Sequence, residues 1–332
     1  MTVSVHIVNW NHRQFLGPLL ESLRRQTYPI ERILVVDNAS TDGSIELLAR
    51  EPGIHLLRFT RNTGFSHGHN QAIAVTKTDA VLVTNPDLLL EPTCIQELVA
   101  ALAADSGLGS VAPCLMRYTL SSDDLREPIR SDTMDAAGLI LRRSRQALNR
   151  GEGSRNQFQQ SDDVFGAPGA LALYRRSALA DVALNGEIFD EDLLAYKEDV
   201  DLACRLRWAN WRTRYVATAR AFHHRGLAHH GDSISAVMKS RGTASSHVRV
   251  LSYRNHLLTL IKNETAGTFL PHLPLILWYE LKKFIYLLIR EPRTLAGLGQ
   301  AIRLAPRIRK KRAWLNERRR ITAAQFRNLL TP

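Results

Sequence analysis

The first hundred residues alternate between short apolar segments and segments with a helical pattern. The apolar segments cover residues 3–8, 32–36, 55–59 and 80–84. The segments predicted as helices cover residues 14–25, 44–50, 66–76 and 92–104. Strands that alternate with helices form parallel sheets, because a parallel pair needs a crossover connection of a dozen or more residues. The sequence therefore predicts an α/β fold with an open, mostly parallel sheet flanked by helices.

Polar residues directly follow each of the four predicted strands. These clusters are Asn9-Trp10-Asn11, Asp37-Asn38-Ala39-Ser40, Arg61-Asn62-Thr63-Gly64 and Asn85-Pro86-Asp87. Ligands of open α/β sheets bind outside the carboxyl ends of the strands. We therefore expect the four clusters to contribute to one binding site.

Two carboxylates in these clusters suit nucleotide chemistry. Asp37 can accept a hydrogen bond from the ring N–H of a pyrimidine, and Asn38 and Ser40 can add further bonds. The alternative is that Asp37 caps the following helix. Asp87 can hold a divalent cation together with diphosphate oxygens, whereas the alternative for Asn85-Pro86-Asp87 is a simple turn.

The second half of the chain has less regular patterns. Residues 120–149 are polar and mixed in charge, which predicts loops, whereas residues 198–210 have a helical pattern. Glu198 and Asp199 begin this helix, where acidic side chains favour the helix dipole and can also act as general bases. His223 follows a predicted strand, and its neutral imidazole can complete a metal shell.

Two other kinds of site are disfavoured. His67 and His69 are two residues apart, which does not place them on one helix face as zinc ligands. The chain contains neither GxGxxG nor GxxxxGK[ST], which argues against a dinucleotide-binding fold and a P-loop NTPase.

Eight segments together resemble the family 2 inverting glycosyltransferases of the GT-A fold, and within them the bacterial rhamnosyltransferase-like branch. The segments are, in chain order, VSVHIVNWN, QTYP, ILVVDNASTDGSIELL, RNTGFSHGHNQAI, VLVTNPDLLLEP, VFGAPGALALYRR, FDEDLLAYKEDVDLACRLRWANWR and ARAFHH. They run from residue 3 to about residue 226, which is roughly two thirds of the chain.

The resemblance implies a nucleotide site on the first half of the chain. Asp37 would bind the base of a nucleoside diphosphate sugar. The other residues expected around this donor are Asn9, Asn38, Ser40, Arg61, Asn62, Gly64, Asn70 and Asn85. Many members of the family have small or amide residues at the positions of His67 and His69. This chain therefore departs from the family's pattern in the residues expected near the phosphates of the donor.

The resemblance also implies the residues that act on the sugar. Asp87 would hold Mg²⁺ or Mn²⁺ at the position of the family's DxD motif, here in an NPD form, with His223 beside the metal and the diphosphate. Glu198-Asp199 matches the family's ED motif, in which the aspartate is the catalytic base. A cation stabilises the departing diphosphate, and a base on the opposite face activates the acceptor hydroxyl. Such in-line attack predicts inversion at the anomeric carbon.

The expected activity is the transfer of a sugar from a dTDP- or UDP-sugar to a lipid-linked or cell-surface polysaccharide. Our first choice of donor is dTDP-rhamnose, which would supply L-rhamnose. A first alternative is a sugar nucleotidyltransferase. Such enzymes usually carry a glycine-rich, arginine-containing loop after the first strand, where this chain has Asn9-Trp10-Asn11-His12. A second alternative is a non-enzymatic protein that binds an anionic surface or a nucleic acid through its basic end.

The positive charge of the chain is concentrated at its C-terminal end. The net charge is +12, and residues 281–332 hold fourteen Lys/Arg but only two acids, which leaves 30 of each sign in residues 1–280. Residues 269–290 are apolar with a narrow polar strip of Glu280, Lys283 and Arg290, which is typical of a helix lying in a membrane interface. The alternative is a core helix packed on the main domain. Nucleic-acid binding is disfavoured because residues 303–320 contain only one aromatic residue, Trp314.

We therefore expect a GT-A domain over residues 1–230, with a donor half (1–104) and an acceptor half (105–230). Residues 231–332 are expected to form a linker and a basic, amphipathic helical tail that contacts anionic membrane. The chain begins directly in a strand without a basic signal-peptide region, and its three cysteines are too far apart for a disulfide framework. The expected location is cytoplasmic, on the inner face of the cell membrane.

Overall fold

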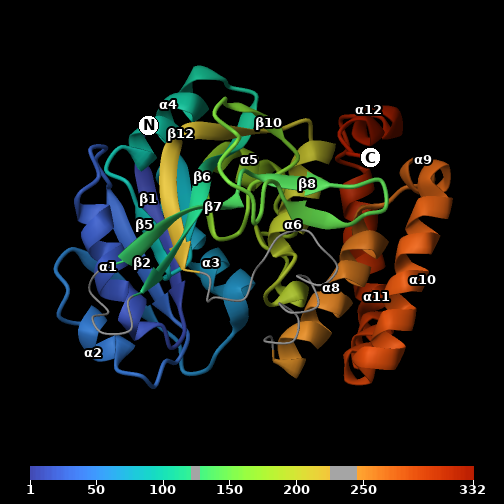
Figure 1. Cartoon of the computed structure of the whole chain (residues 1–332), viewed down its shortest axis with the longest axis horizontal. Helices are drawn as coiled ribbons and strands as arrows, with labels where there is room; N and C mark the ends of the chain where they lie inside the picture. Colours follow the sequence, from blue (N-terminus) through green and yellow to red (C-terminus); the bar gives the residue numbers. More distant parts are fainter. Residues whose placement is uncertain (121–127, 225–244) are drawn as a thin grey trace.

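A mixed sheet forms the centre of the molecule in the computed structural model, which describes residues 1–120, 128–224 and 245–332. The strand order is β10-β12-β6-β11-β4-β1-β2-β3, with β5 paired to β12 and β7 paired to β6. Figure 1 shows the sheet with several of its strands labelled. The strands of the first half are β1 (Val3–Asn9), β2 (Arg32–Asp37), β3 (Ile54–Arg58), β4 (Ala80–Thr84) and β5 (Leu88–Leu90). Those of the second half are β6 (Leu108–Leu120), β7 (Pro128–Ala136), β8 (Leu139–Leu141), β9 (Ala147–Asn149), β10 (Asp162–Val164), β11 (Leu171–Arg175) and β12 (Arg212–His224).

The predicted parallel sheet of the first hundred residues is confirmed. Strands β4, β1, β2 and β3 are parallel neighbours, and the crossovers contain α1 (Arg13–Arg24), α2 (Ser44–Leu48) and α3 (Gly64–Ala74). The apolar positions of α1 at 15, 16, 19, 20 and 23 are all buried, as their spacing predicts. The register of β1 and β2 pairs Asn9 with Asp37, which brings the first two polar clusters together at one sheet edge.

The second half mixes parallel and antiparallel strands, since β10 and β5 run antiparallel to β12, and β7 runs antiparallel to β6. Strand β11 runs antiparallel between β4 and β6, and the long strands β6 and β12 are parallel to each other. Helix α4 (Cys94–Ala104) ends the first half, and the helices of the second half are α5 (Arg176–Asp181), the 3₁₀ helix η1 (Glu191–Leu193) and α6 (Glu198–Trp208).

The prediction of loops over residues 120–149 is wrong for the part that the structure describes, since β7, β8 and β9 lie there. The sequence pattern is misleading because β7 is largely solvent-accessible over its first six residues and buried only at Met134, Asp135 and Ala136. A strand of this kind lacks the apolar run by which buried strands are recognised.

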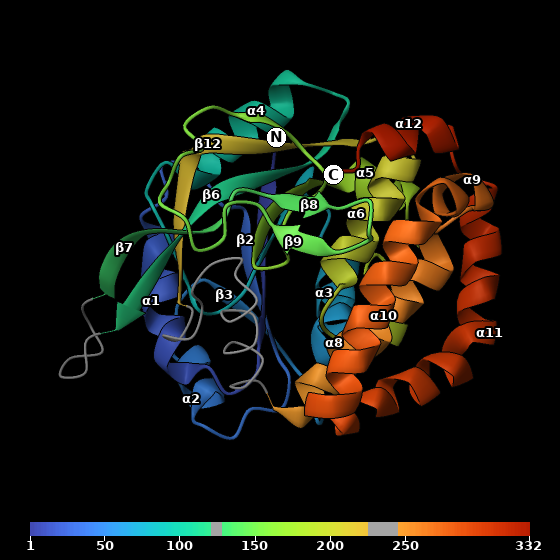
Figure 2. The same ribbon diagram turned by 45° about the vertical axis from the view of Figure 1, so that its right-hand side comes forward.

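The C-terminal helices form a layer beside α6, which Figures 1 and 2 show from two directions. They are α8 (Ser246–Asn263), α9 (Ala266–Phe269), η2 (Leu270–His272), α10 (Leu273–Arg290), η3 (Pro292–Leu295), α11 (Ala296–Asn316) and α12 (Ala323–Asn328). The predicted linker from residue 231 lies almost entirely outside the described residues. Within the described ranges, no helix is both long enough and apolar enough to cross a membrane.

Helix α10 turns Glu280 and Lys283 of its polar strip toward the protein and most of its apolar side chains toward solvent, whereas Arg290 of the strip is exposed. Glu280 accepts a hydrogen bond from His256 of α8 at 2.6 Å, and Lys283 lies 3.3 Å from Glu280. Only Ile276 and Leu287 of this helix are buried. The largely exposed apolar side chains of α10 are Leu275, Leu277, Trp278, Leu281, Phe284, Ile285, Leu288 and Ile289. A helix packed in a core would bury that face, so the alternative of a core helix does not describe α10.

Candidate active site

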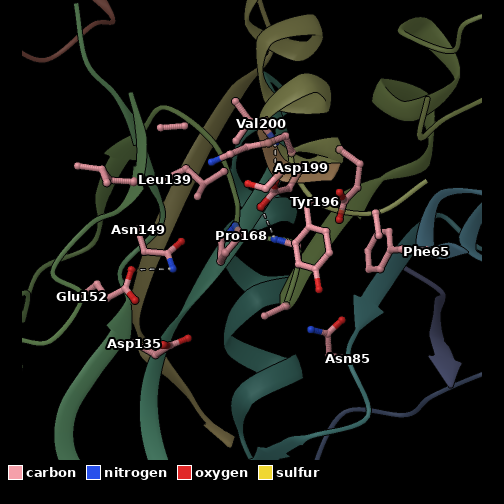
Figure 3. A pocket seen from close by; sticks show the side chains of 18 of the residues that line it. Phe65, Asn85, Asp135, Leu139, Asn149, Glu152, Pro168, Tyr196, Asp199 and Val200 are labelled. Atoms are coloured by element: carbon pink, nitrogen blue, oxygen red, sulfur yellow. Dashed lines mark hydrogen bonds between the residues drawn. The ribbon is translucent and has the colours of Figure 1, made fainter. Parts of the chain in front are cut away.

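A pocket of about 470 Å³ brings together four of the predicted site residues. Asn85 comes from the end of β4, Glu198 and Asp199 from the start of α6, and His223 from the end of β12. Figure 3 shows Asn85 and Asp199 facing the same space as Tyr196 and Phe65. The β8–β9 hairpin contributes a further wall through its apolar residues and Asn149.

Asp199 is held in the pocket by two backbone donors. Its Oδ2 accepts a hydrogen bond from the N–H of Gly169 at 3.0 Å, and its Oδ1 accepts one from the N–H of Val200 at 2.8 Å. The residue is partly exposed and its carboxylate faces the cavity (Figure 3). A carboxylate in this position can accept a proton from a hydroxyl group bound in the pocket.

Neither neighbouring acid has the same access. Glu198 is 6% exposed, and burial, followed by the charge of Asp199, raises the pKa of its carboxyl to about 8. Its Oε2 has no hydrogen-bond partner among the described residues. Asp201 is fully buried in ion pairs with Arg205 at 2.9 Å and Lys262 at 2.8 Å. The geometry therefore favours Asp199 as the base, and that role stays a prediction.

Asp87 and His223 lie together, as expected for shared metal ligands. The Nε2 of His223 is 3.4 Å from the Oδ1 of Asp87, because the antiparallel pairing of β5 with β12 places His223 opposite Leu88. The other ring nitrogen, Nδ1, is 2.8 Å from the Oδ2 of Asp135. Although burial lowers the pKa of His223, the charges of Asp87 and Asp135 raise it to about 9.

Asp135 is the residue of this array that sequence reasoning missed. It is 1% exposed and comes from the end of β7, in the segment predicted as loops. A carboxylate on the far nitrogen of a histidine fixes the ring orientation and tautomer of metal-ligating histidines. The presence of Asp135 therefore supports a metal-facing role for the Nε2 of His223.

The residues present fit a cation that is shared with a substrate. Among the described residues, no group of three or more His, Cys, Asp or Glu side chains could hold a metal ion by itself. Mg²⁺ in phosphate-transfer sites is commonly bound by one or two carboxylates together with substrate phosphates and water. Asp87, with His223 beside it, fits such a shared site. The described residues do not form a closed site in which the protein supplies all the ligands.

The predicted base-binding residues form a second cluster at the ends of β1 and β2. Asp37 is fully buried, and its oxygens accept hydrogen bonds from the side chain of Asn9 and the N–H of Ser40, both at 2.9 Å. The Oδ1 of Asn38 accepts a bond from the N–H of Thr63 at 3.2 Å. Asp37 does not cap the next helix, since α2 begins after Gly43. The cluster is pre-organised, and its contact with a base stays a prediction.

The predicted site residues from Arg61 to Asn70 include exposed loop residues and a buried residue of α3. Arg61 and Asn62 are exposed, and the Oδ1 of Asn62 accepts a bond from the N–H of Gly64 at 2.9 Å. Asn70 donates to the carbonyl of Phe189 at 2.8 Å and to Glu191 at 3.0 Å. The amide of Asn70 thus holds residues 189–191, which precede α6. If Asn70 contacted a donor phosphate through its amide N–H, that contact would have to replace one of these two bonds.

Comparison with known proteins identifies a family. The sequence model described as Glycosyl transferase family 2 matches residues 4–183. An N-acetylglucosaminyl-diphospho-decaprenol L-rhamnosyltransferase of Mycobacterium tuberculosis (strain CDC 1551 / Oshkosh) is 30% identical over 237 residues, covering 63% of this chain and 73% of that protein. The rhamnosyltransferase WbbL of Escherichia coli (strain K12) is 26% identical over 270 residues, which cover 76% of this chain and 96% of that protein.

The fold is similar to that of solved glycosyltransferases. The crystal structure of GalNAc-T7 with UDP, GalNAc and Mn²⁺ superposes with a TM-score of 0.60 at 14% identity. The match covers 79% of this chain but only 48% of that chain. Together with the mostly parallel sheet and its flanking helices, this similarity confirms the predicted GT-A fold.

The raised pKa of Glu198 predicts that the stability of the fold depends on pH. Because the folded pKa of about 8 lies above the ordinary 4.5, the neutral carboxyl stabilises the fold at low pH and this contribution is lost as the pH rises from 4.5 to 8. Glu198→Gln keeps a neutral group at every pH. Thermal unfolding should therefore show the Tm of the wild type falling relative to Glu198→Gln across this range.

The control for this measurement is Glu317→Gln, which removes a carboxyl with a 76% exposed side chain. Its Tm should run parallel to that of the wild type at all pH values. Parallel curves for Glu198→Gln as well would show that the Glu198 carboxyl is ionised like any surface acid.

Proposed function

The chain belongs to glycosyl transferase family 2, and on that premise we propose that it transfers L-rhamnose from dTDP-L-rhamnose to a lipid-linked glycan with inversion. The observation that carries the proposal is that one pocket is lined by both Asp199 and His223, and that His223 contacts Asp87. A base for the acceptor and a polar group for the leaving diphosphate are thereby available to one bound sugar.

The choice of substrates is supported by the relatives. Two of them are named as rhamnosyltransferases, and the name of the one from M. tuberculosis specifies a diphosphate-linked polyprenol that carries N-acetylglucosamine. We propose an acceptor of the same chemical class, a hydroxyl of a sugar on a lipid diphosphate. The family match disfavours the two alternatives, a nucleotidyltransferase and a non-enzymatic binder.

In the proposed mechanism each group acts at one place. Asp37, with Asn9, Asn38 and Ser40 around it, holds the pyrimidine base. Asp199 takes the proton from the acceptor hydroxyl as its oxygen attacks the anomeric carbon. Asp87 and His223 would hold Mg²⁺ or Mn²⁺, which supplies positive charge for the departing diphosphate, and Asp135 orients the imidazole of His223.

The C-terminal helices are proposed to bring the enzyme to its acceptor. In this proposal residues 1–230 are the transferase domain, with a donor half (1–104) and an acceptor half (105–230), and residues 231–332 are a membrane-facing extension on the cytoplasmic side. The support is the exposed apolar face of α10, which includes Trp278 and Ile289 at 60% and 69% exposure. The excess of basic residues in α11 adds attraction to anionic lipid.

The activity is tested with a panel of nucleotide sugars and a lipid-diphosphate acceptor, measured by the release of free nucleoside diphosphate. We expect release from dTDP-L-rhamnose. Asp199→Asn should lower kcat by ~10²-fold or more, because the amide keeps the size but not the basicity of the carboxylate. Nucleotide affinity should change little.

Glu198→Gln serves as the neighbouring control and should be the milder change, since Glu198 is buried and largely neutral. Near-normal kcat of Asp199→Asn at saturating acceptor would refute the assignment of the base. Turnover only with purine nucleotide sugars would refute the choice of donor.

The metal dependence is tested by removal and by substitution. EDTA should abolish turnover, and Mg²⁺ or Mn²⁺ should restore it. Asp87→Ala should prevent this restoration and weaken the Mn²⁺-dependent binding of dTDP in calorimetry. Asp132→Ala, which changes an exposed acid near Asp135 on the same strand, should behave like the wild type. Full activity in EDTA would refute the metal dependence and leave Asn85-Pro86-Asp87 as a simple turn.

Membrane attachment is tested by co-sedimentation with vesicles that contain phosphatidylglycerol. The wild type should sediment at low salt and partly dissociate as salt rises, since each basic residue near the surface contributes ~1 kcal/mol. Leu281→Glu/Ile285→Glu should abolish sedimentation. Ile129→Glu, at an exposed apolar residue of β7, should not. A wild type that remains in the supernatant at low salt would refute the attachment.

A further inference from the structure

The segment between η1 and α6 has an unfavourable backbone conformation. Leu194, Tyr196 and Lys197 all have positive φ, at 62°, 71° and 69°. At Leu194 the chain forms a tight γ-turn, with a ψ of −67° and a 2.7 Å hydrogen bond from the N–H of Ala195 to the carbonyl of Leu193. Residues with side chains adopt such conformations only where the surrounding structure enforces them.

The enforcement comes from α8, in the C-terminal helical layer. Asn255 is fully buried, and its Nδ2 lies 2.7, 2.8 and 2.7 Å from the carbonyl oxygens of Leu193, Ala195 and Tyr196. Its own Oδ1 accepts a hydrogen bond from the Nε of Arg254 at 2.8 Å, which fixes the orientation of the amide. One side chain thus contacts three carbonyls of the strained segment.

The opposite side of the segment is held by the start of α3. The N–H of Ser66 donates to the carbonyl of Leu194 at 3.0 Å. Gly64 packs so closely that a Cβ there would lie 2.7 Å from the same carbonyl oxygen. The segment is therefore clamped between the donor half of the chain and α8.

This segment leads directly into the site. Lys197 is the residue before α6, and Glu198 and Asp199 form the first turn of that helix. Tyr196 and Lys197 themselves line the pocket. A change in the backbone at residues 193–197 would therefore move the Asp199 carboxylate relative to a bound substrate.

We propose that Asn255 is a positioning residue, which holds the 193–197 segment in the conformation that places Asp199 in the pocket. The proposal rests on the proposed function of Asp199 as the base. It makes the C-terminal extension part of the catalytic unit as well as a membrane contact. The next residue on α8, His256, is bonded to Glu280 of α10, so the membrane-facing helix is attached at the same turn.

The test compares Asn255→Ala with Asn263→Ala in the full chain. Asn263 is also a buried amide of α8, but its Nδ2 donates to Asp201 at 2.9 Å and to the carbonyl of Thr259 at 3.1 Å, not to the carbonyls of residues 193–197. Asn255→Ala should lower kcat by ~10²-fold, as expected for a misplaced catalytic group, with little change in donor KM. Asn263→Ala should lower Tm while its kcat stays within ~3-fold of the wild type, below the effect of a misplaced group.

Two further measurements separate positioning from general destabilisation. Leu194→Gly, in the background of Asn255→Ala, should recover part of kcat, because glycine adopts positive φ readily. Hydrogen exchange of the amides at 193–199 should be faster in Asn255→Ala than in Asn263→Ala, whatever the turnover. Equal exchange in the two variants, or equal losses of kcat, would overturn the proposal.

A double-mutant cycle distinguishes this proposal from the proposed function. If Asn255 acts through Asp199, then Asp199→Asn/Asn255→Ala should be no slower than Asp199→Asn alone. Additive losses would overturn the positioning role while leaving Asp199 as the base. Full turnover of Asp199→Asn by itself would overturn the proposed function.

Discussion

The ion pairs of Lys262 connect the C-terminal helices to residues 105–230, through Asp190 and Asp201. The ammonium group, fully buried, lies between Asp190 and Asp201, and the latter is 2.8 Å away. Lys311 of α11 adds a second cation 2.5 Å from Asp190. Burial would raise the pKa of Asp190, but the two lysines lower it well below its usual range. Removing one partner would leave an uncompensated buried charge, which is strongly destabilising.

This charge cluster also contacts α6. Asp201 points into the interior toward Lys262 and Arg205, and Asp199 lies about 200° away around the same helix. The two aspartates therefore face different sides of α6, and only Asp199 lines the pocket. The C-terminal layer thus contacts α6 through Asp201 and the segment before α6 through Asn255.

Several features of the site could be predicted because they are local. The polar residues after β1 and β2 lie at one sheet edge because parallel strands end together. The preference for Asp199 over Glu198 came from the motif alone, and the structure adds a physical reason, since only Asp199 is both accessible and held by backbone donors. Asp135 could not be predicted, because it meets His223 across 88 residues of sequence.

The sequence by itself determined the βα alternation, the polar strand ends and the amphipathic pattern of residues 269–290, since each depends on the spacing of neighbouring residues. Only the tertiary structure decided which face of α10 is exposed, because Glu280 points inward to satisfy the buried His256. The proposed role of Asn255 also depends on the tertiary structure alone. A side chain that bonds carbonyls some sixty residues away leaves no periodic signal, and its partners exist only once α8 has packed on the segment before α6.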